Sequence, residues 1–358
     1  MKHYAHPSEP RDPHRRHSDS RRLGATDVHV SRLGLGAAPL GNLHSPLDEA
    51  EAEATVDAAW ECGVRYFDTA PHYGLGLSER RLGAALAGRP RALFTVSTKV
   101  GRLLVPNPAR TGSDVPVGGF AVPDTLTRQP DYSRDGVLRS LDGSLRRLGL
   151  DRVDLVLVHD PDDHMDTAID QALPALAELR DQGVIGAIGA GMNTVAPLMR
   201  IVTETDVDAV MVAGRWTLVD RSARPLLDLC AERGVSVIAA APFNSGVLAT
   251  PWPSNDAFFD YGPAPAAVLG DARALAEVCV RRQVALPHAA LRFPLRDPAV
   301  ACVVAGARSA AQARSAARRA AEDLSPEDWA AISTVPLTFG TSAAIPGSTP
   351  WSVPRSAP

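Results

Sequence analysis

The chain contains few cysteines, little net charge and no long apolar run. Its four cysteines, Cys62, Cys230, Cys279 and Cys302, are widely spaced and form no Cys-x-x-Cys pair, so we predict that they are reduced. A net charge of −4 gives no reason to expect nucleic acid or an anionic membrane as a partner. No apolar run reaches the length of a membrane span, and the N-terminus lacks the apolar stretch of a secretory signal. We therefore expect a cytoplasmic protein.

Two sequence motifs are also missing. An open, doubly wound sheet that binds a dinucleotide would carry a Gly-x-Gly-x-x-Gly turn directly after an early strand, and the sequence has none there. No serine or cysteine is paired with a base in a recognisable motif, so acyl transfer from a protein nucleophile is not expected.

Short β-branched runs alternate with segments of helical period, and 45% of the residues are hydrophobic, which is enough for a sizeable core. The predicted strands are residues 31–36, 64–68, 93–99, 153–159, 185–189, 209–213, 235–240 and 300–304. The predicted helices are residues 48–62, 78–86, 133–148, 167–182, 194–202, 221–233, 271–283 and 309–321. Strict alternation implies parallel strands with crossover helices, and eight such units close a barrel. We predict an α/β fold, a single-domain (β/α)8 TIM barrel over residues 23–335.

Three segments depart from this alternation. Residues 1–22 are rich in charge, histidine and proline, and we predict a disordered tail. Residues 336–358 are predicted to be a C-terminal tail or a loop over a pocket. Residues 101–132 form a long insert with little periodicity, which we interpret as a substrate-covering loop because it leaves the end of a strand; a tolerated surface insertion is the alternative.

Four polar residues stand at or just after the ends of predicted strands: Asp68, Tyr73, Lys99 and His159. Barrel enzymes build their sites at these carboxyl ends. A phenol has a pKa of about 10, and a nearby ammonium lowers it. We therefore predict that Lys99, held by Asp68, makes Tyr73 a usable general acid or base. A neutral His159 would donate an N–H to the same substrate oxygen.

This set of side chains polarises a carbonyl but cannot supply hydride, so a cofactor must do so. A metal-dependent hydrolase is an alternative, because His159, Asp160, Asp162, Asp163 and His164 lie close together in the sequence. We interpret these residues instead as a polar strand-end turn and the cap of the following helix, and expect no metal.

At these residues the chain resembles the aldo-keto reductase superfamily, over residues 23–333. The segments that carry the resemblance are Asp-Thr-Ala-Pro-His-Tyr-Gly at 68–74 and Asp-Leu-Val-Leu-Val-His at 154–159. The resemblance implies a (β/α)8 barrel that binds NADP(H), possibly NAD(H), with Asp68, Tyr73, Lys99 and His159 as the catalytic tetrad and Tyr73 as the proton donor.

The same resemblance implies a set of cofactor-binding positions. Asn193 would hold the nicotinamide carboxamide, and Trp216 would stack on the ring. The expected pyrophosphate loop contains Pro242, Phe243, Asn244, Ser245, Gly246 and Leu248. The expected adenosine site contains Gly306, Arg308, Ser309 and Gln312, with Arg308 and Ser309 placed for a 2′-phosphate. Three family positions differ, since Met192, Ala213 and the pair at 315–316 replace the usual Ser, Gln and Glu-Asn.

Within the superfamily, the insert and the segments at 159–162, 189–193 and 213–216 are similar to the branch of D-threo-aldose (L-fucose) dehydrogenases and pyridoxal dehydrogenases. This implies oxidation of a sugar hemiacetal to a lactone, with Tyr73 taking the proton. A carbonyl reductase of a biosynthetic pathway, and a cofactor-sensing regulatory barrel with little turnover, are the alternatives. The expected partner is a small-molecule substrate, and the sequence predicts no oligomeric state.

Overall fold

The computed structural model describes residues 20–339; residues 1–19 and 340–358, which include most of the predicted N-terminal tail and of the C-terminal segment, lie outside them. Ser20–Arg22 do not continue a disordered tail as predicted but form strand β1, which pairs antiparallel with β2 (His29–Ser31). Three apolar residues of this hairpin, Leu23, Val28 and Val30, pack with residues from the starts of the barrel strands. This packing holds the hairpin in place against the amino end of the barrel.

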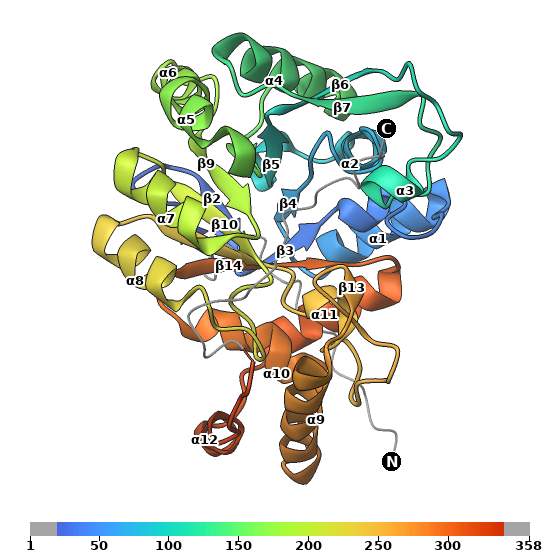
Figure 1. Ribbon diagram of the computed structural model, residues 1–358, viewed down its shortest axis with the longest axis vertical. Coiled ribbons are helices and arrows are strands. Elements are labelled where there is room, and N and C mark those ends of the chain that lie inside the picture. Colours follow the sequence, from blue (N-terminus) through green and yellow to red (C-terminus); the bar gives the residue numbers. More distant parts are fainter. Residues whose placement is uncertain (1–19, 340–358) are drawn as a thin grey trace, which may run out of the picture.

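Eight parallel strands close into a barrel, which confirms the predicted fold (Figure 1). They are β3 (Leu33–Gly36), β4 (Tyr66–Asp68), β5 (Thr95–Val100), β8 (Leu155–His159), β9 (Ala187–Met192), β10 (Ala209–Ala213), β11 (Ser236–Ala240) and β14 (Val300–Gly306). The first barrel strand begins at Leu33 rather than at residue 31, because the residues before it pair with β1. Neighbours around the barrel follow chain order, as right-handed crossovers require.

Helices surround the strands. They are α1 (Glu49–Glu61), α2 (Leu77–Leu86), α4 (Arg134–Leu148), α5 (Met165–Thr167), α6 (Leu173–Asp181), α7 (Val195–Glu204), α8 (Arg224–Arg233), α9 (Ala266–Arg281), α10 (Leu286–Arg292), α11 (Ala310–Ala321) and α12 (Pro326–Ser333). The helix predicted over 167–182 is interrupted by a π-helical turn at Ala168–Ala172. The sequence did not predict α10 and α12, which follow the seventh and eighth units.

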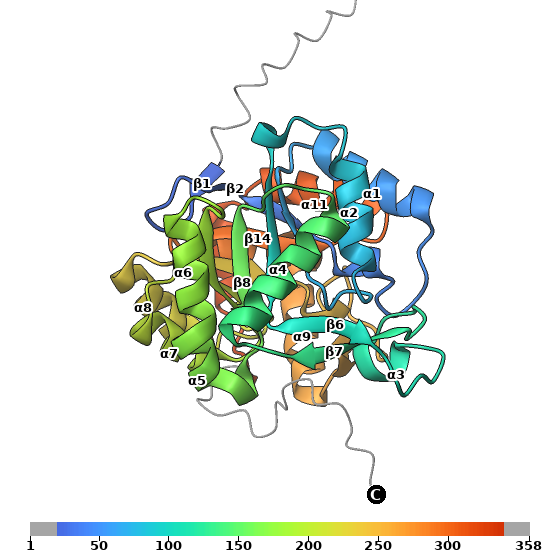
Figure 2. The same cartoon turned by 90° about the horizontal axis from the view of Figure 1, so that it is seen from above.

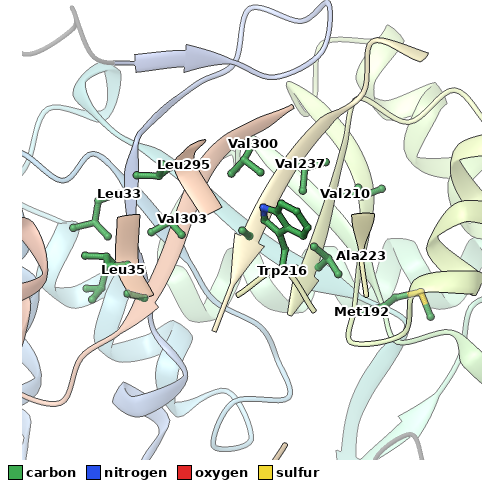
Figure 3. Close-up of a cluster of buried hydrophobic side chains, with 14 of the residues drawn as sticks. Leu33, Leu35, Met192, Val210, Trp216, Ala223, Val237, Leu295, Val300 and Val303 are labelled. Carbon is green, nitrogen blue, oxygen red and sulfur yellow. The ribbon is translucent and has the colours of Figure 1, made fainter. Parts of the chain in front are cut away.

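Side chains on the strands alternate between two apolar layers. Met211 and Ile238 point into the barrel, whereas Val210 and Val237 point outward and pack under the helices (Figure 3). Glycine is needed where the interior is crowded: a Cβ on Gly34 would lie 2.6 Å from the Tyr66 ring. The filled interior leaves the carboxyl ends of the strands as the place where polar side chains gather.

The insert is not the irregular loop that its composition predicted. Its two arms are strands β6 (Arg102–Pro106) and β7 (Leu126–Pro130), which pair antiparallel, and a short helix α3 (Val115–Gly118) lies between them. Figure 2 shows this hairpin alongside α4. Gly101 and Tyr132 flank the hairpin, and a Cβ on Gly101 would lie 2.1 Å from the Tyr132 ring, so this close approach requires glycine.

A second excursion, which the sequence did not reveal, lies between β11 and α9. Strands β12 (Phe258–Phe259) and β13 (Gly262–Pro263) form a short hairpin whose turn residues, Asp260 and Tyr261, both have positive φ. The described chain ends beside it, where Phe339 packs edge-on against Phe259 at 5.1 Å between ring centroids. Within residues 20–339, no helix combines the length and the apolar character needed to cross a membrane.

Candidate active site

The ends of β4, β5 and β8 bring Asp68, Tyr73, Lys99 and His159 together. Lys99 Nζ lies 2.9 and 2.7 Å from the two carboxylate oxygens of Asp68 and 3.1 Å from the Tyr73 hydroxyl. The rings of Tyr73 and His159 meet edge to face, with centroids 5.9 Å apart. Asp68, Lys99 and His159 are buried and Tyr73 is half-buried, so only the phenol end of the cluster reaches the mouth of the barrel.

Each member of this cluster is fixed by its surroundings. The Ser97 hydroxyl donates to Asp68 at 2.8 Å and is itself 2.8 Å from the Tyr66 hydroxyl in the barrel interior. Gly74 holds the loop that carries Tyr73 against Gly41, because a Cβ on Gly74 would lie 2.2 Å from the Gly41 carbonyl oxygen. The cluster is therefore set by the barrel strands and not by flexible side chains.

The ionisation of the cluster differs in one respect from the prediction. Burial raises the pKa of the Tyr73 phenol. The Lys99 charge lowers this pKa, but by less than burial raises it, so the predicted net lowering is wrong for the protein without its cofactor. Burial disfavours the Lys99 charge, but Asp68 and Tyr73 outweigh it and raise the pKa of Lys99 to about 12. Burial and the charges of Arg102 and Lys99 hold the pKa of His159 well below its ordinary value. At neutral pH the site holds a protonated phenol, an ammonium and a neutral imidazole.

Two charged residues beside the cluster escaped the sequence analysis. Arg102, at the start of β6, donates to Asp160 Oδ2 at 2.8 Å, and the same oxygen lies 3.5 Å from His159 Nε2. His159 Nδ1 has no hydrogen-bond partner in the described part of the chain. An acceptor stands only on the Nε2 side, which favours the tautomer with its proton on Nε2. The adjacency of Asp160 to His159 is a usable signal, but the sequence alone predicts only a polar turn at Asp160.

The insert also reaches the cluster through Phe120 and Arg128. The Phe120 ring lies 6.1 Å from the Tyr73 ring and 5.5 Å from the His72 ring, centroid to centroid. Arg128 donates to the His72 carbonyl oxygen at 2.8 Å and pairs with Asp114. The insert thus forms one wall beside the phenol, with an aromatic part and a charged part.

The predicted pyrophosphate loop has a conformation suited to an anion. Asn244, Ser245 and Gly246 all have positive φ, and a Cβ on Gly246 would meet nothing within 4 Å. Such backbone turns can point N–H groups at a phosphate, although here the N–H groups of Asn244 and Gly246 donate to the carbonyl oxygens of Ala241 and Phe243, each at 3.0 Å. Asn244 is buried and donates to the Gly214 carbonyl oxygen at 2.8 Å, while its Oδ1 has no partner among residues 20–339. Leu248 is fully buried in the core, so it supports this loop rather than lining it.

Other predicted cofactor positions also follow strand ends. Just before the positive-φ turn at 244–246, Pro242 is buried and Phe243 is half-buried. Asn193 follows β9, and its carbonyl oxygen accepts a hydrogen bond from Arg215 Nε at 2.8 Å. Arg215 also pairs with Asp260, at 2.8 Å, which ties the β12–β13 hairpin to the strand ends.

The expected adenosine site lies at the end of β14. Arg308 Nη1 donates to the carbonyl oxygen of Leu43 at 2.6 Å, and Nη2 lies 3.1 Å from those of Ser45 and Pro46. Its guanidinium is therefore already engaged by the 43–46 segment, which the expectation of a 2′-phosphate contact did not foresee.

The other residues of that site are arranged around the start of α11. Ser309 caps the helix by accepting from the Gln312 backbone N–H at 3.2 Å, and the Gln312 side chain accepts from Arg308 N at 2.8 Å. Gly306 is exposed and pairs with Gly36 across β14 and β3. The exposed backbone at Gly306 therefore lies shortly before the N-terminus of α11.

Trp216, the residue predicted to stack on the nicotinamide, is buried beside Phe293 and Arg224. It is 8% exposed and packs in the outer apolar layer with Val210 and Val237, under the helices (Figure 3). Phe293 lies 5.3 Å from its ring and the Arg224 guanidinium lies 5.0 Å from the ring centroid. These neighbours are protein groups, and the stacking of Trp216 on nicotinamide stays a prediction.

No group of three or more His, Cys, Asp or Glu side chains in residues 20–339 is placed to hold a metal ion. The acidic side chains of the turn after β8 contact different partners: Asp160 pairs with Arg102, and Asp162 accepts a hydrogen bond from the Thr194 hydroxyl at 2.6 Å.

The closed parallel barrel and the buried Asp-Lys-Tyr-His cluster at its carboxyl end define the class of barrel oxidoreductases. Residues 32–335 match the model of the aldo/keto reductase family. The chain belongs to this family. Enzymes of the family act on small molecules with a nicotinamide cofactor.

Two curated relatives are similar over nearly their whole length. The chain is 44% identical to a D-threo-aldose 1-dehydrogenase of Pseudomonas sp, covering 87% of this chain and 96% of that one. It is 37% identical to a pyridoxal 4-dehydrogenase of Microbacterium luteolum, covering 89% and 98%. Among solved structures, an aldo-keto reductase of Bacillus halodurans in its holo form aligns with a TM-score of 0.71 and 27% identity, over 91% of this chain and 97% of that one. The branch expected from the sequence is confirmed.

Proposed function

We propose that the protein transfers hydride between a nicotinamide cofactor and a sugar hemiacetal, or a related aldehyde or ketone, with Tyr73 as general acid and base. The observation that carries this proposal is the 3.1 Å contact between Lys99 Nζ and the Tyr73 hydroxyl inside a buried cluster. The similarity to an enzyme named for D-threo-aldoses supports the sugar as substrate.

The reaction balances with the groups present. In oxidation, Tyr73 must first have lost its proton to solvent; the C–H bond of the substrate then breaks with its electron pair going to the cofactor, the O–H proton goes to the phenolate oxygen of Tyr73, and a C=O bond forms. Reduction runs the same steps in reverse, with Tyr73 giving its proton to the new alkoxide. His159 Nε2–H donates to the substrate oxygen, and the Lys99 ammonium stabilises the phenolate whenever it forms.

The residues around the strand ends fit a dinucleotide. The positive-φ turn at Asn244–Gly246 suits the pyrophosphate, Asn193 can hold the carboxamide, and Ser309 begins a helix whose N-terminus suits an anion. When bound, the cofactor supplies or accepts the hydride. Because Arg308 already donates to three carbonyl oxygens, we propose that the site accepts NAD(H) as well as NADP(H).

The insert is proposed to cover the substrate. Phe120 lies against the ring of Tyr73, and Arg102 and Arg128 bring charge to the same side of the barrel mouth. A wall that is both aromatic and charged suits a sugar, which has apolar C–H faces and polar edges. A carbonyl reductase acting on an aldehyde or ketone would use the same tetrad in the opposite direction.

The test is to mix the protein with NAD or NADP and a panel of aldoses, and to follow the absorbance of the reduced cofactor. Tyr73→Phe should lose about a hundredfold or more in kcat, the usual contribution of a general acid or base, while cofactor binding and Tm stay unchanged. Turnover by Tyr73→Phe at the wild-type rate would falsify the assigned role. Tight cofactor binding with no turnover by the wild type would instead favour a regulatory barrel.

A further inference from the structure

Asp160 is a charged residue at the site that the proton transfer to Tyr73 does not use. It follows His159 directly, and its side chain is 25% exposed where β8 ends. Both of its side-chain contacts are made by Oδ2, which lies 2.8 Å from Arg102 Nη2 and 3.5 Å from His159 Nε2. In residues 20–339, Oδ1 has no partner. Within the described part of the chain, one carboxylate oxygen beside the reacting groups thus accepts no hydrogen bond.

The backbone fixes this carboxylate in place. Asp160 has a φ of 42°, in the left-handed region, which non-glycine residues rarely adopt, although asparagine and aspartate do so more readily than most. Its N–H donates to the Gly191 carbonyl oxygen at 3.1 Å, and the Tyr132 hydroxyl lies 2.7 and 2.9 Å from the carbonyl oxygens of His159 and Asp160. A strained conformation persists only where its surroundings hold it, and such positions are common at functional sites.

The insert supplies the groups that orient Asp160. Arg102 begins β6 and Tyr132 follows β7, so the two ends of one hairpin converge on the turn after β8. Arg102 is 17% exposed at its side chain and faces Tyr73 and Tyr132 as well as Asp160. An insert that lay only on the surface would not need to bring a half-buried arginine to this carboxylate.

We propose that Asp160, oriented by Arg102, accepts a hydrogen bond from the substrate hydroxyl on the carbon next to the reacting carbon. Asp160 Oδ2 lies 3.5 Å from His159 Nε2, so the carboxylate stands next to the imidazole, and its Oδ1 and His159 Nε2 can contact two oxygens on adjacent carbons. This inference rests on the proposed function and makes it more specific. It assigns the site to polyhydroxylated substrates, and it makes Asp160 a specificity-determining residue.

The expected size of the preference follows from the chemistry of the contact. A hydrogen bond to a charged group changes binding by about 10- to 100-fold. The wild-type kcat/KM for an aldose should therefore exceed that for its 2-deoxy analogue by about this factor, whereas a variant without the carboxylate should treat the two alike.

The experiment is a thermodynamic cycle in which the substrate hydroxyl and the Asp160 carboxylate are removed separately and together. The kcat/KM values for an aldose and its 2-deoxy analogue are measured with the wild type, Asp160→Asn and Asp160→Gly. Asparagine and glycine both tolerate positive φ, so at least one variant should keep the backbone of this turn. Asp163→Asn is the matched control, because it removes the same charge from an exposed position of the same turn.

The outcomes separate this inference from the proposed function. A preference for the aldose that falls about tenfold or more in both Asp160 variants, but not in Asp163→Asn, supports the inference. An active wild type whose preference is the same in all four proteins overturns it and leaves the oxidoreductase function standing. A wild type that oxidises no aldose while binding cofactor contradicts the proposed function itself.

Discussion

The ammonium of Lys99 lies 3.1 Å from the hydroxyl of Tyr73 and 2.7 Å from the nearer carboxylate oxygen of Asp68. Under the proposed function, the phenol is the member of this cluster whose charge changes during the reaction. Lys99 stays protonated because its pKa is raised to about 12, and burial keeps His159 neutral. The phenol is then poised to release a proton to an alkoxide, and the cost of the phenolate is lowered by one fixed positive charge.

Lys99→Met should shift to higher pH the limb on which the rate of oxidation rises with pH. Burial raises the pKa of Tyr73, and the Lys99 charge is the largest opposing influence, so its removal raises that pKa further. Oxidation needs the phenolate, and a neighbouring charge alters the ionised fraction about tenfold or more. The measurement is kcat against pH for alcohol or hemiacetal oxidation, with cofactor affinity and Tm as controls. An unshifted limb would show that another group takes the proton.

A second limb should appear near pH 6 for hydroxylated substrates. Burial and Asp162 raise the pKa of Asp160 to about 6, against the opposing charges of Arg102 and Lys99. Above this pH the carboxylate is ionised and accepts the substrate hydroxyl; below it the carboxyl is protonated and the contact weakens. We expect kcat/KM for an aldose to fall with decreasing pH through about 6, and Asp160→Asn to lack this fall. The same acid limb in both proteins would assign it to a different group.

The sequence predicted the barrel well because the hydrophobic period changes cleanly between strands and helices. The predicted strand at 209–213 matches β10, and the predicted helix at 133–148 differs from α4 by one residue. The tetrad could be found because strand ends of a barrel converge on one rim. None of this required knowledge of how loops fold.

The remaining features depend on contacts that sequence spacing does not reveal. The engagement of Arg308 by the 43–46 segment joins residues far apart in the chain. The burial of Trp216 depends on Phe293 and on the helices packed over its strand. The net pKa of Tyr73 depends on how deeply the site is buried, which outweighs the charge that the sequence placed beside it.

The engagement of Arg308 predicts how the protein distinguishes the two dinucleotides. Because the guanidinium donates to the carbonyl oxygens of Leu43, Ser45 and Pro46, Arg308→Ala should loosen this segment and weaken NAD and NADP by similar factors. A direct contact with a 2′-phosphate would instead cost NADP about 10- to 100-fold while sparing NAD. Dissociation constants of both cofactors decide between these outcomes. Arg314→Ala is the control, since Arg314 pairs with Glu61 on the outer helices.

The approach of Gly74 to Gly41 predicts a substitution that affects both stability and catalysis. Gly74 and Gly63 both have positive φ, but only at Gly74 would a Cβ meet backbone atoms, at 2.2 Å from the Gly41 oxygen. Gly63→Ala therefore isolates the conformational cost, about 1 kcal/mol, whereas Gly74→Ala adds a steric clash that must displace the loop carrying Tyr73. We expect a larger fall in Tm for Gly74→Ala, together with a loss of kcat that Gly63→Ala does not show. Equal Tm values and equal activities would mean that the position of Tyr73 does not depend on this contact.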